Sequence, residues 1–210
     1  MRVASLGCAL AALAAGATRG GAQGLVPAGG ISIVSTRVRG TNELTGTVLA
    51  GQGALALGRL ELALGYVQGK IGPAGASGAG QDLVEGVALL GVRPASWLRL
   101  AVGPHARSYT LTGGTQLRWA FWELRARVSG AFVGSAGRGY VELWRALSAS
   151  VNVPERFDHA QGGEAGMVVH LAGAPLELRL GYRIDHAVLG GGTRLETVDA
   201  VVVGVGLSGR

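Results

Sequence analysis

The sequence predicts an all-β protein, an up-and-down antiparallel transmembrane β-barrel of about ten strands, and three observations predict it. Apolar and polar residues alternate with a period of two, which is typical of strands whose two faces meet different surroundings. Most candidate strands exceed the ~5 to 6 residues of soluble strands and approach the ~9 to 11 that a tilted strand needs to cross a bilayer. Tight and longer connections alternate, as in barrels with turns on one side of a membrane and loops on the other.

The segment PLELRLGYRID, from Pro175 to Asp185, shows the alternation most clearly. Leucine, tyrosine and isoleucine occupy one face of this segment, and glutamate, arginine and aspartate occupy the other. The apolar face would point into the core of a soluble barrel, whereas in a membrane barrel it would contact lipid and the charges would face the lumen. High apolarity along the whole chain favours the membrane barrel.

Turn signals divide the chain into ten candidate strands. They span 31–39, 45–57, 59–70, 82–93, 97–109, 115–132, 138–151, 163–172, 176–187 and 193–207. Tight connections lie at 58, 94–96, 133–137 and 173–175, and longer ones at 41–44, 71–81, 110–114, 152–162 and 188–192. An even number of strands places both ends of the chain on the side of the tight turns. Eight strands are the alternative, if the first segment is a periplasmic lid or one hairpin is divided wrongly.

In each candidate strand, apolar and polar residues alternate along a segment that turn residues flank, with three exceptions. Arg145 falls on the apolar side of its strand, the strand at 82–93 is mixed, and Arg194 and Glu196 are out of phase with Asp199. A β-bulge, which inserts one extra residue and changes the facing, or a wrongly divided register would explain each exception.

Composition agrees with many strands and turns. The chain has 38 Gly but only 6 Pro in 210 residues, 48% of its residues are hydrophobic, and its mean hydropathy is +0.35. Charged residues make up 15% of the chain, well below the ~25% of ordinary soluble domains. The formal net charge is +6, but basic residues are mostly spaced singly among acidic ones, so nucleic acid is not an expected partner.

The N-terminus predicts a secretory signal peptide at 1–22. Arg2 precedes an apolar, alanine-rich run that ends in small residues, and cleavage is expected after Ala17 or Ala22. The barrel domain then spans 23–210. Cys8 is the only cysteine and lies inside this segment, so the mature chain is expected to have no disulfide and no thiolate metal site.

The signal peptide, the ten amphipathic strands and the alternating loop lengths resemble a small bacterial outer-membrane β-barrel protein over essentially the whole mature chain. The resemblance implies a location in the bacterial outer membrane, with outer-membrane lipid around the chain and the barrel-assembly machinery as its partner during insertion. Such barrels commonly end in an aromatic residue, whereas this sequence ends in Leu207-Ser208-Gly209-Arg210. Candidates for two aromatic girdles are Trp97 and Phe132 at the periplasmic end and Tyr66, Tyr109, Trp119 and Tyr182 towards the outer end.

The predicted lumen carries the charges. Its candidate lining residues are Glu61, Arg99, Arg107, Glu123, Arg125, Arg127, Glu142, Glu177, Arg179, Arg183 and Asp185. Charges in a narrow space of low dielectric must pair across strands. The predicted function is therefore a non-enzymatic outer-membrane barrel, either structural and plugged by salt bridges or a narrow passive pore that favours anions through its excess of arginine. The sequence names no small solute.

Two other functions remain as alternatives. Asp158-His159 and Asp185-His186 are expected at the outer rim, where proteases of the omptin type, also ten-stranded, activate a water with a His-Asp pair and a second acidic pair. No such acidic pair is evident, and neighbours on a strand face opposite ways, so no enzyme is predicted. The other alternative is a soluble, lipocalin-like binding protein of the periplasm. His105 and His170 lack partners at metal-ligand spacing, so neither a metal nor a cofactor is expected.

Overall fold

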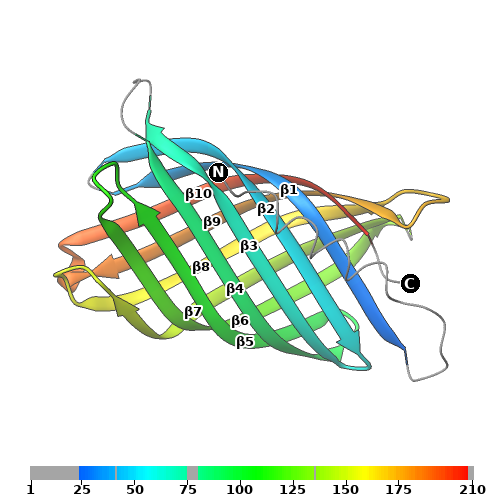
Figure 1. Ribbon diagram of the computed structural model, residues 1–210. Helices are drawn as coiled ribbons and strands as arrows, with labels where there is room; N and C mark the ends of the chain where they lie inside the picture. The colour runs from blue at the N-terminus through cyan, green and yellow to red at the C-terminus, as the bar shows by residue number, and fades with distance from the viewer. Residues whose placement is uncertain (1–23, 41, 75–79, 135, 208–210) are drawn as a thin grey trace.

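The computed structural model is a closed barrel of ten antiparallel strands (Figure 1). It describes residues 24–40, 42–74, 80–134 and 136–207, so the predicted signal peptide with Cys8 and the residues 208–210 lie outside the described residues. The strands are β1 (Leu25–Arg39), β2 (Glu43–Leu57), β3 (Leu60–Pro73), β4 (Gln81–Ala95), β5 (Leu98–Thr110), β6 (Gln116–Val133), β7 (Gly137–Val151), β8 (Phe157–His170), β9 (Leu176–Leu189) and β10 (Arg194–Leu207). The predicted fold class and strand number are confirmed.

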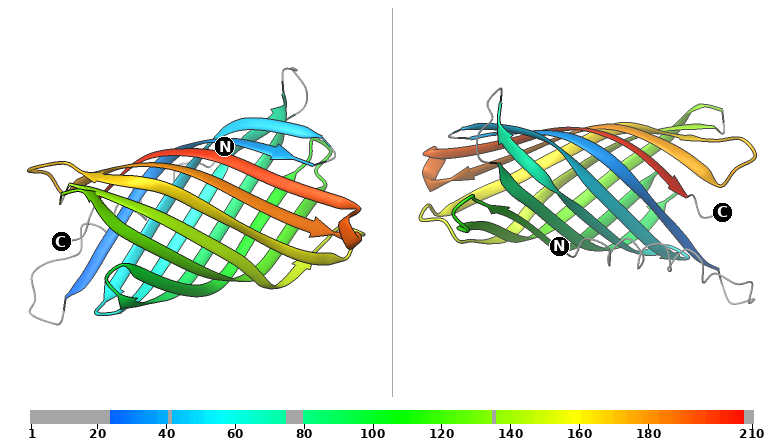
Figure 2. Two further views of the ribbon diagram at one scale, coloured as in Figure 1. Left: turned by 180° about the vertical axis from the view of Figure 1, so that it is seen from behind. Right: turned by 45° about the horizontal axis from the view of Figure 1, so that its top comes forward.

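Pairing between the first and last strands closes the barrel. β1 pairs with β2 on one side and with β10 on the other, from Gly29 opposite Leu207 to Arg39 opposite Thr197. Figure 2 shows the blue β1 beside the red β10. The first segment is therefore a full barrel strand, and the eight-strand alternative, with this segment as a lid, is wrong.

The two ends of the barrel differ in their connections. The turn end carries the connections at 58–59, 96–97, 134–136 and 171–175, together with the start of β1 and the end of β10. The loop end carries the connections at 40–42, 74–80, 111–115, 152–156 and 190–193, the last of which contains the short 3-10 helix η1 (Gly190–Gly192). Within the described part of the chain, no helix is long and apolar enough to cross a membrane.

The outside of the barrel is apolar. On β9, Leu178, Leu180, Tyr182 and Ile184 are 48%, 47%, 50% and 43% exposed, whereas Asp185 is 3% exposed. Large apolar side chains are exposed in the same way on the other strands, although on β8 Met167 is the only one. A water-soluble barrel needs the opposite arrangement, because its exposed face must be polar along its length.

Strand boundaries differ most from the prediction at the beginning of two strands. β1 begins at Leu25 rather than at 31, and β8 begins at Phe157 rather than at 163. Both missed segments contain glycines, which the turn signals assigned to loops. In β8, Gly162 instead lies opposite Asp185 and leaves room for the indole of Trp144, because an added Cβ would lie 2.5 Å from its Nε1 atom.

The exceptions to the alternation have different causes. Arg145 is exposed on the outer face, and the register of β6 with β7 shifts by one residue just after it, between Trp122 and Glu123. Glu196 is buried inside the barrel, while Asp199 on the same strand faces out and pairs with Arg39 at 2.5 Å. The register of β10 with β9 is continuous, so the expected bulge is absent there and the strand carries acids on both faces.

A layer of large apolar side chains packs inside the barrel near the loop end. We call this layer the apolar plug: Ile71, Leu83, Tyr109, Trp119 and Leu189, each between 0% and 4% exposed. Two girdle predictions are thereby wrong, since Tyr109 and Trp119 point inwards. They share a strand face with buried His105 and Glu123 respectively, as the period of two requires. Of the other girdle candidates, Trp97, Phe132 and Tyr182 are about half exposed, at 54%, 53% and 50%, whereas Tyr66 is only partly exposed.

Candidate functional site

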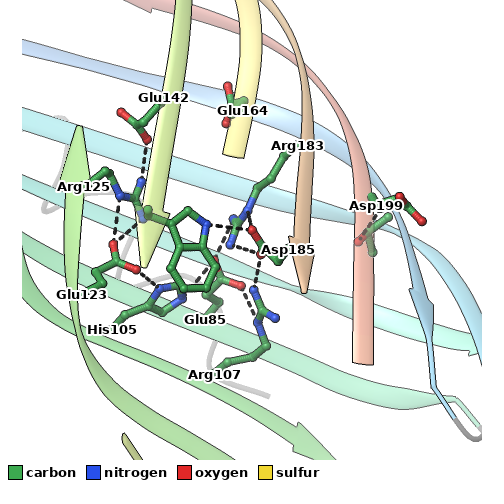
Figure 3. Close-up of polar contacts among 12 residues, drawn as sticks. Glu85, His105, Arg107, Glu123, Arg125, Glu142, Glu164, Arg183, Asp185 and Asp199 are labelled. Carbon is green, nitrogen blue, oxygen red and sulfur yellow. Dashed lines mark hydrogen bonds and ion pairs between the residues drawn. The ribbon is translucent and has the colours of Figure 1, made fainter. Parts of the chain in front are cut away.

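The candidate site is the charged interior between the apolar plug and the turn end, and Figure 3 shows the part of it that side chains of β4 to β9 form. Arg107 on β5 is its centre. Its Nε atom donates to Glu85 on β4 at 2.8 Å and its Nη2 atom to Asp185 on β9 at 2.7 Å. Glu196 on β10 lies 3.9 Å from the same guanidinium. These contacts cross the barrel from one wall to the other.

Asp185 is held by three donors. Besides Arg107, Arg183 donates to Oδ2 at 2.6 Å and the Trp144 indole donates to Oδ1 at 2.9 Å. Arg183 also lies 2.8 Å from Glu85. Two arginines and two carboxylates thus alternate around a closed ring, which compensates each buried charge and satisfies its hydrogen-bonding groups.

His105 lies between two carboxylates. Its Nδ1 atom is 2.9 Å from Glu123 and its Nε2 atom is 3.3 Å from Glu85, and the residue is only 1% exposed. The ring packs against Phe121 at a centroid distance of 4.5 Å, and Phe121 stacks on Trp144 at 5.5 Å. This imidazole therefore joins the ring around Arg107 to the charges nearer the turn end.

A second chain of ion pairs continues towards the turn end. Arg125 donates to Glu123 at 2.5 Å and to Glu142 at 2.8 Å. Arg99 lies 2.7 Å from Glu61 and 3.8 Å from Glu142. Glu61 also pairs with Arg93, whose side chain is 50% exposed at the turn end. The network thus reaches solvent at this end.

A third cluster surrounds the phenol of Tyr140. Its hydroxyl donates to Glu164 and accepts a hydrogen bond from Arg179 Nε at 2.9 Å. Arg179 also pairs with Glu164 at 2.5 Å and donates across the interior to Gln52 on β2. Arg127 stacks on the Tyr140 ring, with its guanidinium carbon 3.8 Å from the centre of the ring.

The structure brings most of the residues that were proposed to line the lumen into these clusters. Glu177 lies apart from them, near the turn end, 3.7 Å from His170. Sequence reasoning missed Glu85, His105, Tyr140, Glu164 and Glu196. The strand at 82–93 does not alternate clearly, so the side of the sheet that Glu85 faces was not predicted. Glu164 was missed because β8 was predicted to begin only at 163. When these carboxylates are counted with the others in the described chain, the expected excess of arginine over acid is absent.

The four rim candidates do not come together as an acid-imidazole site. Asp158 accepts a hydrogen bond from the Gly191 amide at 2.6 Å, and His186 lies 3.1 Å from the Thr197 hydroxyl. Asp185 is inside the barrel rather than at the rim, and none of the hydrogen bonds in the described residues joins His159 to a carboxylate. The described part of the chain also holds no cluster of three or more residues that suits a metal ion.

A cavity of about 270 Å³ lies beside the charged clusters. Arginines of β5, β6 and β9 line one wall, and small residues of β1, β2 and β3 line the other. The small residues leave this space, because neither glycine nor alanine reaches across the interior. The cavity extends from Gly29 and Glu61, near the turn end, to Val198 and Tyr109, where the apolar plug begins.

Apolar residues outside, charged residues inside and a fully closed sheet define the class of the protein. Only a helix or a closed barrel satisfies all backbone groups in lipid, and the outward apolar band excludes a soluble barrel. The chain is a small β-barrel of the bacterial outer-membrane type.

Comparison with solved structures finds, among others, three proteins that match most of this chain at low sequence identity. Neisserial surface protein A is 14% identical, with 87% of this chain and 96% of that chain covered and a TM-score of 0.43. Ail, the attachment invasion locus protein of Yersinia pestis, is 10% identical, with coverages of 87% and 97% and a TM-score of 0.38. An outer membrane channel from Pseudomonas putida F1 is 11% identical, with coverages of 89% and 99% and a TM-score of 0.47. No protein-family model matches the chain, and no curated protein matches it.

Proposed function

We propose that the protein is a non-enzymatic barrel of the bacterial outer membrane whose interior is closed, so that it serves a structural role rather than conducting solutes. One observation carries the proposal: ion pairs of Arg107 with Glu85 and Asp185 cross the interior directly beneath the apolar plug. Ions would have to break these pairs and then enter an apolar layer, and each step is costly.

The outward face supports the proposed location. Apolar side chains form most of the outer surface of the barrel. The charged outward residues Arg37 and Arg39 lie at the loop end of β1, whereas Arg145 is an exception near the middle of β7. In the orientation usual for outer-membrane barrels, the loops face outside and the turns face the periplasm. We expect the protein to fractionate with outer membranes and to require detergent for extraction; recovery as a water-soluble monomer would contradict the location.

A planar-bilayer recording tests the closed interior. The purified barrel is expected to give no steady conductance, whereas Tyr109→Ala combined with Trp119→Ala removes two large side chains of the apolar plug and is expected to open a path. A matched control is Trp122→Ala, which removes an indole from the outward face, where Trp122 is 53% exposed. Conductance by the control would indicate a leak caused by loss of stability.

A narrow passive pore is the second candidate function, and the cavity of about 270 Å³ favours it. Steady conductance by the unmodified protein, selective for anions or for cations, would establish the pore and refute the closed barrel.

A further inference from the structure

Two arginines lie directly opposite each other inside the barrel. Arg99 on β5 and Arg127 on β6 are register partners in an antiparallel pair. Opposite side chains in such a pair begin only ~4.5 to 5.5 Å apart, and like charges placed there destabilise the sheet. Both residues line the cavity. Glu61 and Glu142, at 2.7 and 3.8 Å from Arg99, offset part of this repulsion, and an anion between the two arginines would offset more of it.

Both arginines also have unused donor capacity. None of the ion pairs in the described ranges involves Arg127, whose guanidinium instead stacks on Tyr140 at 3.8 Å. The Nη2 atom of Arg99 is buried and has no hydrogen-bond partner among the described residues. A buried donor without a partner loses its hydration with no compensation. The nearby carboxylates are already engaged, since Glu142 accepts from Arg125 and Glu164 accepts from Arg179.

The wall across the cavity consists mostly of small, uncharged residues, and its one carboxylate, Glu61, is paired with Arg93 and Arg99. Ser32, Ala50, Ala54, Ala63 and Gly65 line it. A cavity of ~150 Å³ suffices to hold benzene, and this one measures about 270 Å³. It therefore has room for an aromatic ring or a short branched chain together with a carboxylate. The two walls suit the two halves of such a molecule.

Access to the cavity is from the turn end. Gln52 faces the interior and is exposed, and the side chains of Glu177 and Arg183 are 24% and 21% exposed. Towards the loop end the apolar plug is buried. A ligand would enter from the side that the proposed orientation assigns to the periplasm.

We propose that this cavity is a binding site for a small organic carboxylate with an apolar body, whose carboxylate lies between Arg99 and Arg127 and whose body packs on the alanines of β2 and β3. Guanidinium groups bind carboxylates through two parallel hydrogen bonds, which suits two arginines with free donors. The site is a dead end in a closed barrel, so this binding goes beyond the structural role and does not depend on conduction.

Equilibrium dialysis of the barrel in lipid nanodiscs against benzoate tests the proposal. We expect saturable binding of one benzoate per barrel, and Arg127→Gln is expected to weaken it about tenfold or more, as for loss of a charge-assisted hydrogen bond. Ala63→Leu narrows the uncharged wall without altering a charge and is also expected to weaken binding. Arg145→Gln makes the same change of charge on the exposed outer face and is expected to leave binding unchanged.

Two related probes test the two halves of the site. Benzamide has the shape of benzoate without its charge, and inorganic phosphate has charge without an apolar body; both are expected to bind at least about tenfold more weakly. The proposal is overturned if the unmodified barrel shows no saturable benzoate binding, if Arg127→Gln binds benzoate as well as Arg145→Gln does, or if phosphate binds as tightly as benzoate. Each variant is first checked for folding by its electrophoretic mobility before and after heating.

Discussion

Single residues inside this barrel are held by partners that come from distant strands. Asp185 on β9 accepts from Arg107 on β5 and from Trp144 on β7, so its environment depends on contacts that span most of the chain. A buried pair of charges adds little net stability compared with apolar residues of the same size, but removal of one partner leaves the other buried and uncompensated. Among single substitutions, those that leave a buried charge without its partner are therefore expected to lower the stability most.

Arg107→Met is expected to lower the free energy of unfolding by ~3 to 5 kcal/mol, because Glu85 and Asp185 lose their shared partner. Arg37→Met removes a partner of Glu43 at 3.5 Å in a pair whose side chains are 55% and 45% exposed, and is expected to cost only ~0 to 1 kcal/mol. Urea titration in lipid vesicles, followed by tryptophan fluorescence, measures both.

A double variant checks the cause of this loss. Adding Glu85→Gln to Arg107→Met removes one of the orphaned charges and is expected to recover part of the stability, which a double-mutant cycle would measure as a coupling energy. Strictly additive losses would show that the two side chains do not act as a pair.

Gly162→Ala is expected to destabilise the barrel by ~1 to 3 kcal/mol, as overpacking does. The new methyl group would lie 2.5 Å from Trp144 Nε1 and 2.6 Å from the Ile184 carbonyl oxygen, so the indole must move and its hydrogen bond to Asp185 is lost. Gly86→Ala is the matched control, since nothing lies within 4 Å of an added Cβ there. Equal unfolding curves for the two variants would contradict the close packing of Trp144.

At the scale of the element, each strand separates two surroundings. β9 exposes Leu178, Leu180 and Tyr182 on one face and directs Arg179 and Arg183 into ion pairs on the other. A shift of register by one residue would exchange the two faces, placing charges in lipid and leucines among the interior ions. Both faces therefore specify the same register.

Leu180→Arg places a charge near the middle of the outward apolar band of β9 and is expected to cost ~2 to 4 kcal/mol in a bilayer. Ser108→Arg makes the same addition on the outer face of β5, close to its loop end, and is expected to cost only ~0 to 1 kcal/mol. Unfolding in vesicles compares the two. If both variants lose the same stability, depth in the membrane is not the cause, and the outward band is not in contact with lipid.

At the scale of the whole molecule, stability depends on closure. β10 pairs with β9 and with β1 along most of its length, so no edge strand is left open between them. The only segment of β1 that lacks β10 as a neighbour lies before Gly29 and contains Pro27. Proline has no amide proton and is tolerated where no partner needs one.

Val203→Pro tests the closure. Val203 lies opposite Ile33 of β1, and its amide faces β1, because the carbonyls of the odd-numbered residues Asp199 and Val205 of β10 face β1. Proline at this position therefore removes a donor from the closing seam. Without heating, the unmodified barrel is expected to run as a folded band in a detergent gel. We expect the variant to lack this band. Leu25→Pro, in the segment of β1 that β10 does not reach, is expected to keep that band; its loss in both variants would mean that the seam has no special role.

Sequence reasoning located the strands well and the interior partners poorly. The alternation in 176–187 identified the outward leucines of β9, because facing follows from local parity. The same reasoning assigned Tyr109 and Trp119 to an outer girdle, although their parity with His105 and Glu123 places them inside. It left Glu85 as a single carboxylate, since neither Arg107 nor Arg183 is near it in the sequence.

The sequence by itself determined the ten strands, their alternating faces and the apolar outer surface, because these depend on the period of two and on turn residues within each segment. Only the tertiary structure decided which charges meet. The partners Glu85, Arg107 and Asp185 lie on three strands whose relative heights depend on the registers summed around the closed barrel. Those registers also bring large side chains together at the loop end and small ones together near the turn end, where they leave a cavity. The pattern within a single strand does not predict which side chains of different strands lie at the same height.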